Sequence, residues 1–112
     1  MKIKTEYVSK WRIVEMSDWD QDFIDLVAPG HLTINADGTG DFAFGAFEAE
    51  VDCRVEKKGD HEQLAFSFEG SDEGDAVSGR GWATVRGKQM EGWFIFHFGD
   101  QSTFKAQRNK PK

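Results

Sequence analysis

The chain has 112 residues, the usual length of one domain, and we expect a single domain over residues 1–112 with flexible ends at 1–9 and 108–112. Its 20 acidic residues outnumber its 14 lysines and arginines, and the net charge of −6 opposes binding to a nucleic-acid backbone. One cysteine excludes an internal disulfide, and the chain shows neither a signal segment nor an apolar run of membrane-spanning length, which predicts a cytoplasmic protein that does not bind membranes.

The first predicted elements are a strand and a short helix. Bulky and β-branched residues at 11–16 predict the strand, and Ser17-Asp18 is a helix-start signal. Pro29-Gly30 would end the helix, whose apolar residues recur at helical spacing: Trp19, Phe23, Leu26 and Val27. Because this stripe is too narrow to stabilise a helix alone, we expect the helix to plug one end of a sheet.

From residue 31 onward, short apolar segments alternate with turn signals. The clearest strand is 47–56, in which every second residue is apolar. The parity of the phenylalanines changes across Gly45-Ala46, which indicates a bulge, a corner or a tight turn. The other expected strands are 31–35, 41–45, 63–70, 77–86, 89–98 and 102–107. This pattern predicts an all-β fold, an antiparallel up-and-down β-barrel of about eight strands with one short N-terminal helix.

The most specific local prediction concerns the turn at Gly87-Lys88. A two-residue loop with glycine first is typical of a type II′ hairpin, and it fixes the pairing of the flanking strands. On one face Trp82 would lie opposite Trp93, with Arg80 opposite Ile95 and Ser78 opposite His97. On the other face the spaces beside Gly79 and Gly81 would accommodate the rings of Phe96 and Phe94.

The hairpin has two possible orientations. With the phenylalanines inside, the two tryptophans lie outside, where a partner protein, a second copy, the N-terminal segment with Tyr7 or another local flap of the same chain would cover them. With the tryptophans inside, Arg80 and His97 would lie beside a cavity and could hold an anionic or polar ligand. We favour the first orientation, because the tryptophan face also carries residues typical of solvent-facing positions: Thr84, Arg86, Gln89 and Glu91.

The leading strand with Trp11, the short helix and the run of hairpins resemble the calycin plan of lipocalins, fatty-acid-binding proteins and avidins. The segments WRIVEMSDWDQDFIDL, FSFEGSDEGD, SGRGWA and HFGDQSTFKA are similar to a family of small bacterial proteins. This second resemblance covers nearly the whole chain. It implies a bacterial, cytoplasmic protein and supplies no catalytic residues.

Patterns for metal binding are incomplete. Asp18, Asp20 and Asp22 occupy positions one, three and five of an EF-hand loop, but Phe23 replaces the glycine and Pro29 the closing glutamate. The acidic residues at 69–75 are typical of a solvated turn. The three histidines lack the paired spacing of a zinc site. We expect no metal and no cofactor.

Patterns for catalysis are also incomplete. His97, Asp100 and Ser102 contain the residue types of a hydrolase triad, but no nucleophile-elbow sequence accompanies them. Cys53 lies on the apolar face of its strand, where a thiol is expected to be buried and inert. We expect no catalytic residues.

Two functions therefore remain. The first is a non-enzymatic interaction module that binds a protein, or a second copy of itself, through a face formed by Arg80, Trp82, Trp93, Ile95 and His97. The second is a small-ligand carrier or sensor with a calycin-like internal cavity near Arg80 and His97.

Overall fold

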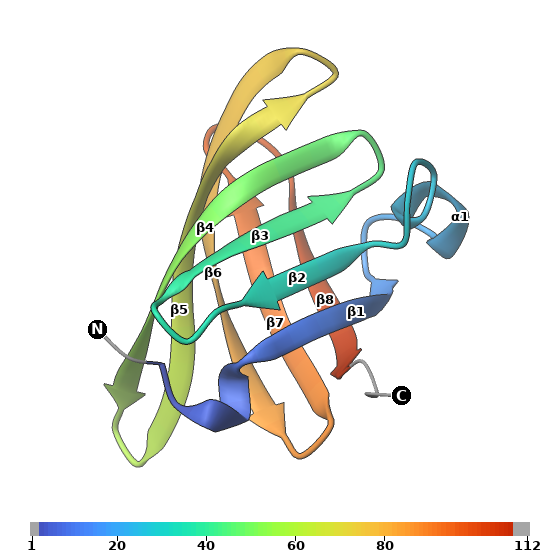
Figure 1. The fold of residues 1–112 in the computed structure, drawn as a ribbon. Coiled ribbons are helices and arrows are strands. Elements are labelled where there is room, and N and C mark those ends of the chain that lie inside the picture. Colours follow the sequence, from blue (N-terminus) through green and yellow to red (C-terminus); the bar gives the residue numbers. More distant parts are fainter. Residues whose placement is uncertain (1–2, 109–112) are drawn as a thin grey trace.

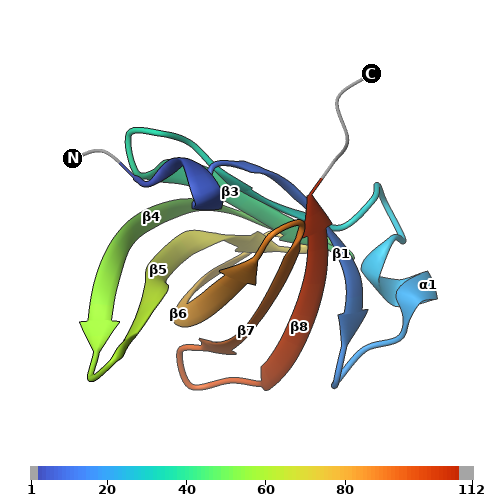
Figure 2. The same ribbon diagram turned by 90° about the horizontal axis from the view of Figure 1, so that it is seen from below.

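The computed structural model describes residues 3–108 and shows a closed antiparallel barrel in which eight strands follow one another in chain order (Figure 1). The 3-10 turn η1 (Thr5–Tyr7) precedes the barrel, and the short helix α1 (Gln21–Ile24) lies between the first two strands. The strands are β1 (Ser9–Met16), β2 (His31–Ile34), β3 (Thr39–Phe44), β4 (Phe47–Lys58), β5 (His61–Asp72), β6 (Asp75–Arg86), β7 (Gln89–Phe96) and β8 (Gln101–Arg108). Pairing of β1 with β8 closes the barrel, as the view from below shows (Figure 2). The predicted fold class is confirmed.

Phenylalanine rings fill the interior of the barrel. Phe42 on β3 is completely buried, and its ring centroid lies 5.1 Å from that of Phe94 and 5.3 Å from that of Phe47. Four further rings lie within 6.4 Å of it, those of Phe44, Phe66, Phe68 and Phe104. An eight-stranded barrel is just wide enough to be filled by its own side chains, and here aromatic rings occupy that space.

The β6–β7 hairpin has the predicted register and orientation. Trp82 pairs with Trp93, and Gly81 pairs with Phe94, which is completely buried. Gly87 has a φ of 59°, as the first position of a type II′ turn requires. A Cβ atom at Gly81 would lie 2.6 Å from the ring of Phe66 on the neighbouring β5, so this glycine makes room for an inward ring from each side.

Tight turns and strand ends explain two other sequence features. The change in phenylalanine parity arises from a two-residue turn at Gly45-Ala46, because Phe44 pairs with Phe47 across it. The strand expected to reach residue 98 ends at Phe96 instead. Phe98 has a φ of 61° and belongs to the following turn, where its side chain is 98% exposed.

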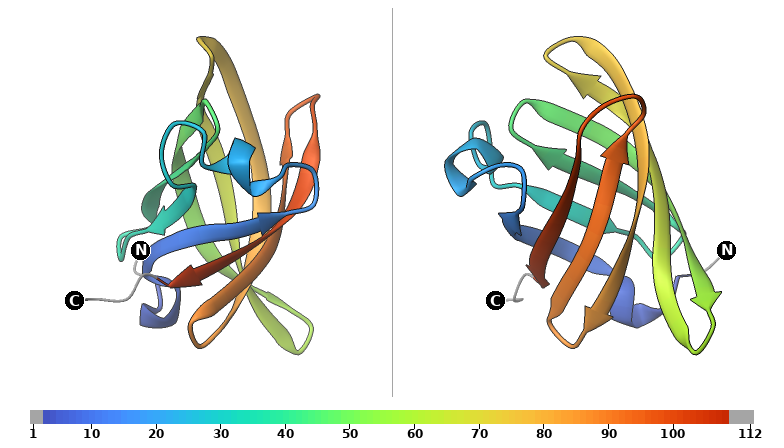
Figure 3. Two further views of the ribbon diagram at one scale, coloured as in Figure 1. Left: turned by 90° about the vertical axis from the view of Figure 1, so that its right-hand side faces the viewer. Right: turned by 180° about the vertical axis from the view of Figure 1, so that it is seen from behind.

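Successive connections of an up-and-down sheet lie at opposite ends of the barrel, so the two ends are formed by different segments of the chain (Figures 1 and 3). At one end the interior is covered by η1 and the residues before it, with Ile3 and Tyr7 buried, and Trp11 donates its indole N–H to the carbonyl of Tyr7 at 2.9 Å. Of the ends expected to be flexible, residues 3–9 are therefore packed against the barrel and Arg108 belongs to β8, whereas 1–2 and 109–112 lie outside the described residues. Burial, together with the nearby Glu62, raises the pKa of Tyr7 to about 12.

The helix is shorter than predicted and packs differently. Its N-cap is Asp20, whose carboxylate accepts a hydrogen bond from the backbone N–H of Phe23, rather than Ser17-Asp18. Ile24 is the buried residue, whereas Leu26 and Val27 are 64% and 73% exposed, so the predicted apolar stripe is wrong at these two positions. The helix ends early because Asp25 turns toward β1. Within residues 3–108 no helix has the length and hydropathy needed to cross a membrane.

Candidate functional site

The residues predicted from sequence meet on the outer surface of β6 and β7. Arg80 pairs with Ile95 in the row next to Trp82 and Trp93, and His97 follows the end of β7, where its backbone N–H donates to the carbonyl of Ser78 at 2.7 Å. We call this surface the tryptophan face. Arg80 and His97 are exposed, so the alternative orientation, with both residues beside an internal cavity, is wrong.

Trp82 is the uncovered residue of the tryptophan face. Its side chain is 40% exposed, so no flap formed by residues 3–108 covers it. Trp93 is half-buried and donates its indole N–H to the Oε1 atom of Gln101 at 2.9 Å, while the guanidinium of Arg80 lies 6.0 Å from its ring centroid. The face therefore combines an unpaired indole with an indole that is already fixed in place.

A hollow of about 420 Å³ adjoins the two indoles on the outside of the barrel. The small residues Ala65 and Ser67 of β5 line it next to the tryptophans, and Arg54 of β4 lies directly across from Ala65. The row Arg54, Ala65, Trp82 and Trp93 thus places a small side chain between an arginine and an indole.

A second site lies at the other end of the barrel from η1, the end that carries α1 and the β3–β4, β5–β6 and β7–β8 turns (Figure 3). A pocket of about 250 Å³ opens there, and we call it the mouth pocket. Its lining comes from the segment around α1, from the β7–β8 turn and from strand residues near the three turns: Trp19, Phe23, Phe44, Phe47, Asp72, Val77, Phe96, Gly99 and Asp100. Sequence reasoning placed none of these residues in a site.

Five aromatic rings form a continuous wall of the mouth pocket. The ring of Trp19 lies 6.1 Å from that of Phe23 and 5.1 Å from that of Phe44. Phe44 is followed by Phe47 at 5.3 Å, and Phe47 by Phe96 at 5.1 Å. Phe44 and Phe47 are buried and belong to the barrel core, whereas Phe23 is partly exposed. The pocket is therefore the solvent-facing end of the filled interior.

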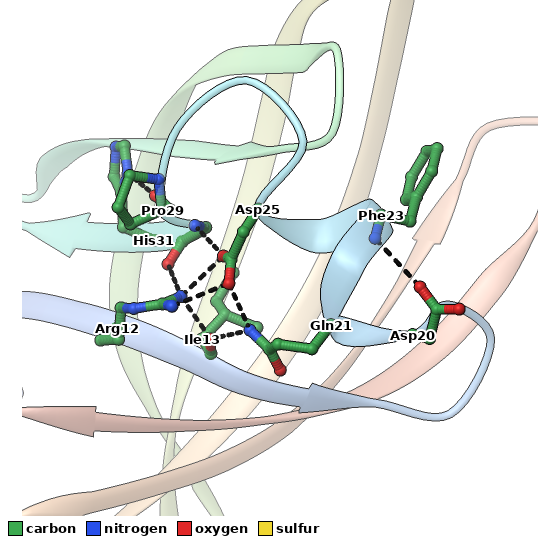
Figure 4. Close-up of polar contacts among 9 residues, drawn as sticks. Arg12, Ile13, Asp20, Gln21, Phe23, Asp25, Pro29 and His31 are labelled. Carbon is green, nitrogen blue, oxygen red and sulfur yellow. Dashed lines mark hydrogen bonds and ion pairs between the residues drawn. The ribbon is translucent and has the colours of Figure 1, made fainter.

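Hydrogen bonds of Asp25 hold the segment around α1 in place (Figure 4). Its two carboxylate oxygens accept from the two terminal nitrogens of Arg12 at 2.8 Å each, and further bonds come from Gln21 Nε2 and the backbone N–H of Gly30. The Arg12 guanidinium keeps the pKa of Asp25 well below its ordinary range. The backbone N–H of Gly45 also donates to the carbonyl of Ile24, so one wall of the mouth pocket is fixed to both β1 and the β3–β4 turn.

The charges around the mouth pocket are almost all negative. Asp72 and Asp100 are exposed and line it. The connecting segments at this end, residues 17–30, 45–46, 73–74 and 97–100, contain no lysine or arginine. None of the ion pairs found among the described residues includes Asp72 or Asp100.

The polar groups weighed for catalysis and metal binding are separated. Ser102 is buried, where its hydroxyl lies 3.2 Å from that of Ser17 and donates to the carbonyl of Thr103. His97 is exposed. Burial raises the pKa of the Cys53 thiol to about 12. Among residues 3–108, no three histidine, cysteine or acidic side chains converge on a position that could hold a metal ion.

Comparisons with known proteins give no match, whether with protein-family models, curated proteins or solved structures. The resemblances to calycins and to a family of small bacterial proteins therefore stay predictions.

Proposed function

We propose that this protein is a non-enzymatic interaction module that associates with a second copy of itself through the tryptophan face. The observation that carries the proposal is the exposure of Trp82 beside a hollow on the outside of a barrel whose interior is full. Exposed tryptophans at a hollow are the residues most often found to dominate binding energy in protein interfaces.

Barrel closure supports recognition through side chains. Pairing of β1 with β8 closes the sheet, so every strand has a neighbour on each side over at least part of its length, and only the ends of the longer strands, such as residues 54–58 of β4, are paired on one side alone. Most of the outer surface therefore offers a partner side chains rather than a backbone edge, and Trp82 presents the largest exposed indole there.

Charge supports a second copy as the partner. Two chains of net charge −6 repel each other over most of their surface. The hollow beside the indoles is an exception, because its lining carries both signs: Asp52, Arg54, Glu56, Lys58 and Arg80. Such a mixed pattern can complement itself across a two-fold axis, where each patch meets an identical patch.

The small-ligand carrier has less support in its calycin-like form. Phe42 and the rings around it occupy the centre of the barrel, and Arg80 and His97 lie outside it. A cytoplasmic location in a bacterial cell remains part of our proposal, and the buried thiol of Cys53 suits a reducing compartment.

Sedimentation equilibrium and native mass spectrometry of the wild-type chain and of Trp82→Ala test the proposal. We expect a concentration-dependent dimer whose dissociation constant rises at least about 30-fold in Trp82→Ala, the effect of losing roughly 2 kcal/mol at an interface hot spot. Trp93→Ala should weaken the dimer as well, and both variants should keep the circular dichroism spectrum of the wild type.

Leu26→Ala is the matched control, because Leu26 is also an exposed apolar side chain but lies outside the tryptophan face. It should leave the dimer unchanged. A wild-type chain that stays monomeric at submillimolar concentration, or a dimer that persists in Trp82→Ala, would reject the proposal.

A further inference from the structure

The mouth pocket combines two kinds of group that together favour one class of ligand. Its wall is a continuous arc of five aromatic rings, and its polar lining includes two carboxylates and no basic side chain. We propose that the mouth pocket binds a small organic ammonium ion, with the alkylated nitrogen against the rings and its charge facing Asp72 and Asp100.

The aromatic wall supplies attraction that a neutral ligand lacks. The face of a tryptophan or phenylalanine ring carries negative charge density and attracts a cation within about 6 Å of the ring centroid. Trp19 is the best such ring in the pocket, and its neighbours Phe23 and Phe44 continue the wall on either side. Alkyl groups on the nitrogen would also replace water at these rings, so an alkylated ammonium ion suits the wall better than a hydrated metal ion.

The two carboxylates select the sign of the charge. Asp72 comes from the end of β5 and Asp100 from the β7–β8 turn, so the two enter the pocket lining from separate strands. Lysine and arginine are missing from every connecting segment at this end of the barrel, and neither carboxylate takes part in an ion pair found among the described residues. An anionic ligand would be repelled at the same position.

The size of the pocket limits the ligand. A volume of about 250 Å³ is smaller than the pockets that usually hold drug-sized molecules, which begin near roughly 300 Å³. The filled interior behind Phe44 and Phe47 prevents deeper entry. The ligand is therefore a compact ion, such as a quaternary ammonium group with a short substituent.

This site is independent of the proposed self-association. The lining of the mouth pocket shares no residue with the lining of the hollow beside Trp82 and Trp93. A failure of one proposal leaves the other standing.

Choline and 3,3-dimethylbutan-1-ol form a matched pair of probes, because the second replaces the charged nitrogen of the first by carbon. We would titrate each into isotope-labelled protein and follow the amide and indole signals by NMR. Choline should shift the indole signal of Trp19 and the amide signals of Gly45 and Gly99. Its dissociation constant should be at least about fivefold lower than that of the neutral alcohol, the effect of one exposed charge interaction.

Variants of the carboxylates locate the effect. Asp72→Asn and Asp100→Asn should each weaken choline binding about fivefold and leave the binding of the alcohol unchanged. Asp75→Asn is the control, because Asp75 pairs with Asp72 at the β5–β6 turn but is not part of the pocket lining. Equal affinity for the two probes, equal choline affinity in all three variants, or no binding of choline would each overturn the proposal.

Discussion

Replacing Phe42 by alanine tests whether the barrel interior is as full as the structure indicates. The side chain is completely buried and has six phenylalanine rings within 6.4 Å, all of them tilted or edge-on to it. Loss of a buried phenylalanine side chain destabilises a protein by about 3–5 kcal/mol, because transfer energy is lost and a cavity remains. Edge-to-face ring pairs add stability beyond their buried area, so we expect about 4 kcal/mol or slightly more.

Urea unfolding followed by tryptophan fluorescence measures this loss, which should lower the melting temperature by about 15 °C. Phe42→Leu should lose less stability, so its free energy of unfolding stays measurable if the alanine variant does not fold. Val27→Ala is the control, because Val27 is 73% exposed and its loss should change stability by less than about 0.5 kcal/mol. A loss below roughly 1 kcal/mol in Phe42→Ala would refute the filled interior and restore support for an internal ligand cavity.

Two further predictions concern ionisable groups. The hydrogen bonds from Arg12 keep the folded-state pKa of Asp25 below the ordinary value of 3.8. The ionised carboxylate therefore stabilises the fold fully above pH 3.8, and this stabilisation is lost as the pH falls through the folded-state pKa. Asp25→Asn should therefore cost about 2 kcal/mol at pH 7, and chemical unfolding at successively lower pH should show the difference from wild type shrinking below pH 3.8; an equal difference throughout would contradict this. The buried thiol of Cys53, with its pKa raised to about 12, should react with a disulfide reagent at pH 8 only as fast as the protein unfolds, whereas fast labelling of the folded chain would contradict its burial.

Local rules in the sequence were sufficient to predict the barrel and one hairpin in detail. A two-residue turn at Gly87-Lys88 leaves a single pairing for the flanking strands, so every partner in the hairpin follows from it. The sequence left two orientations of that hairpin open, and the polar residues on the tryptophan face favoured the one that the structure shows. The run of short strands joined by turns predicted the closed sheet. Within each strand, the alternation of apolar and polar residues indicated which side chains point into the barrel.

The helix boundaries did not follow from the sequence because a distant residue decides them. Periodicity extended the apolar stripe to Leu26 and Val27, but the carboxylate of Asp25 binds Arg12 on β1 and turns the chain there. Helical spacing describes the local preference of a segment and contains no information about a partner 13 positions earlier in the chain.

The mouth pocket was missed for a related reason. Alternation predicts that Phe44, Phe47 and Phe96 point inward, but it does not say how far along the barrel axis each one lies. The position of each ring along the barrel axis depends on the register of several successive strand pairs. The pocket forms because four separate segments of the chain come together at the same end of the barrel. One sequence signal was present, namely that these three phenylalanines stand at the ends of strands next to turns.

The barrel's own construction restricts where it can bind anything. Closure pairs every strand with two neighbours over at least part of its length, the phenylalanine rings occupy the interior, and Ile3 and Tyr7 are buried at one end. Most backbone edges, the interior and one end of the barrel are thereby removed as binding surfaces among the described residues. The exposed indole of Trp82 and the aromatic mouth beside Trp19 are features that packing does not explain, because each leaves apolar rings in contact with solvent. Elsewhere the same fold buries seven other aromatic side chains almost completely: Tyr7, Trp11, Phe42, Phe66, Phe68, Phe94 and Phe104. Binding at these two places is the physical reason we offer for that exposure.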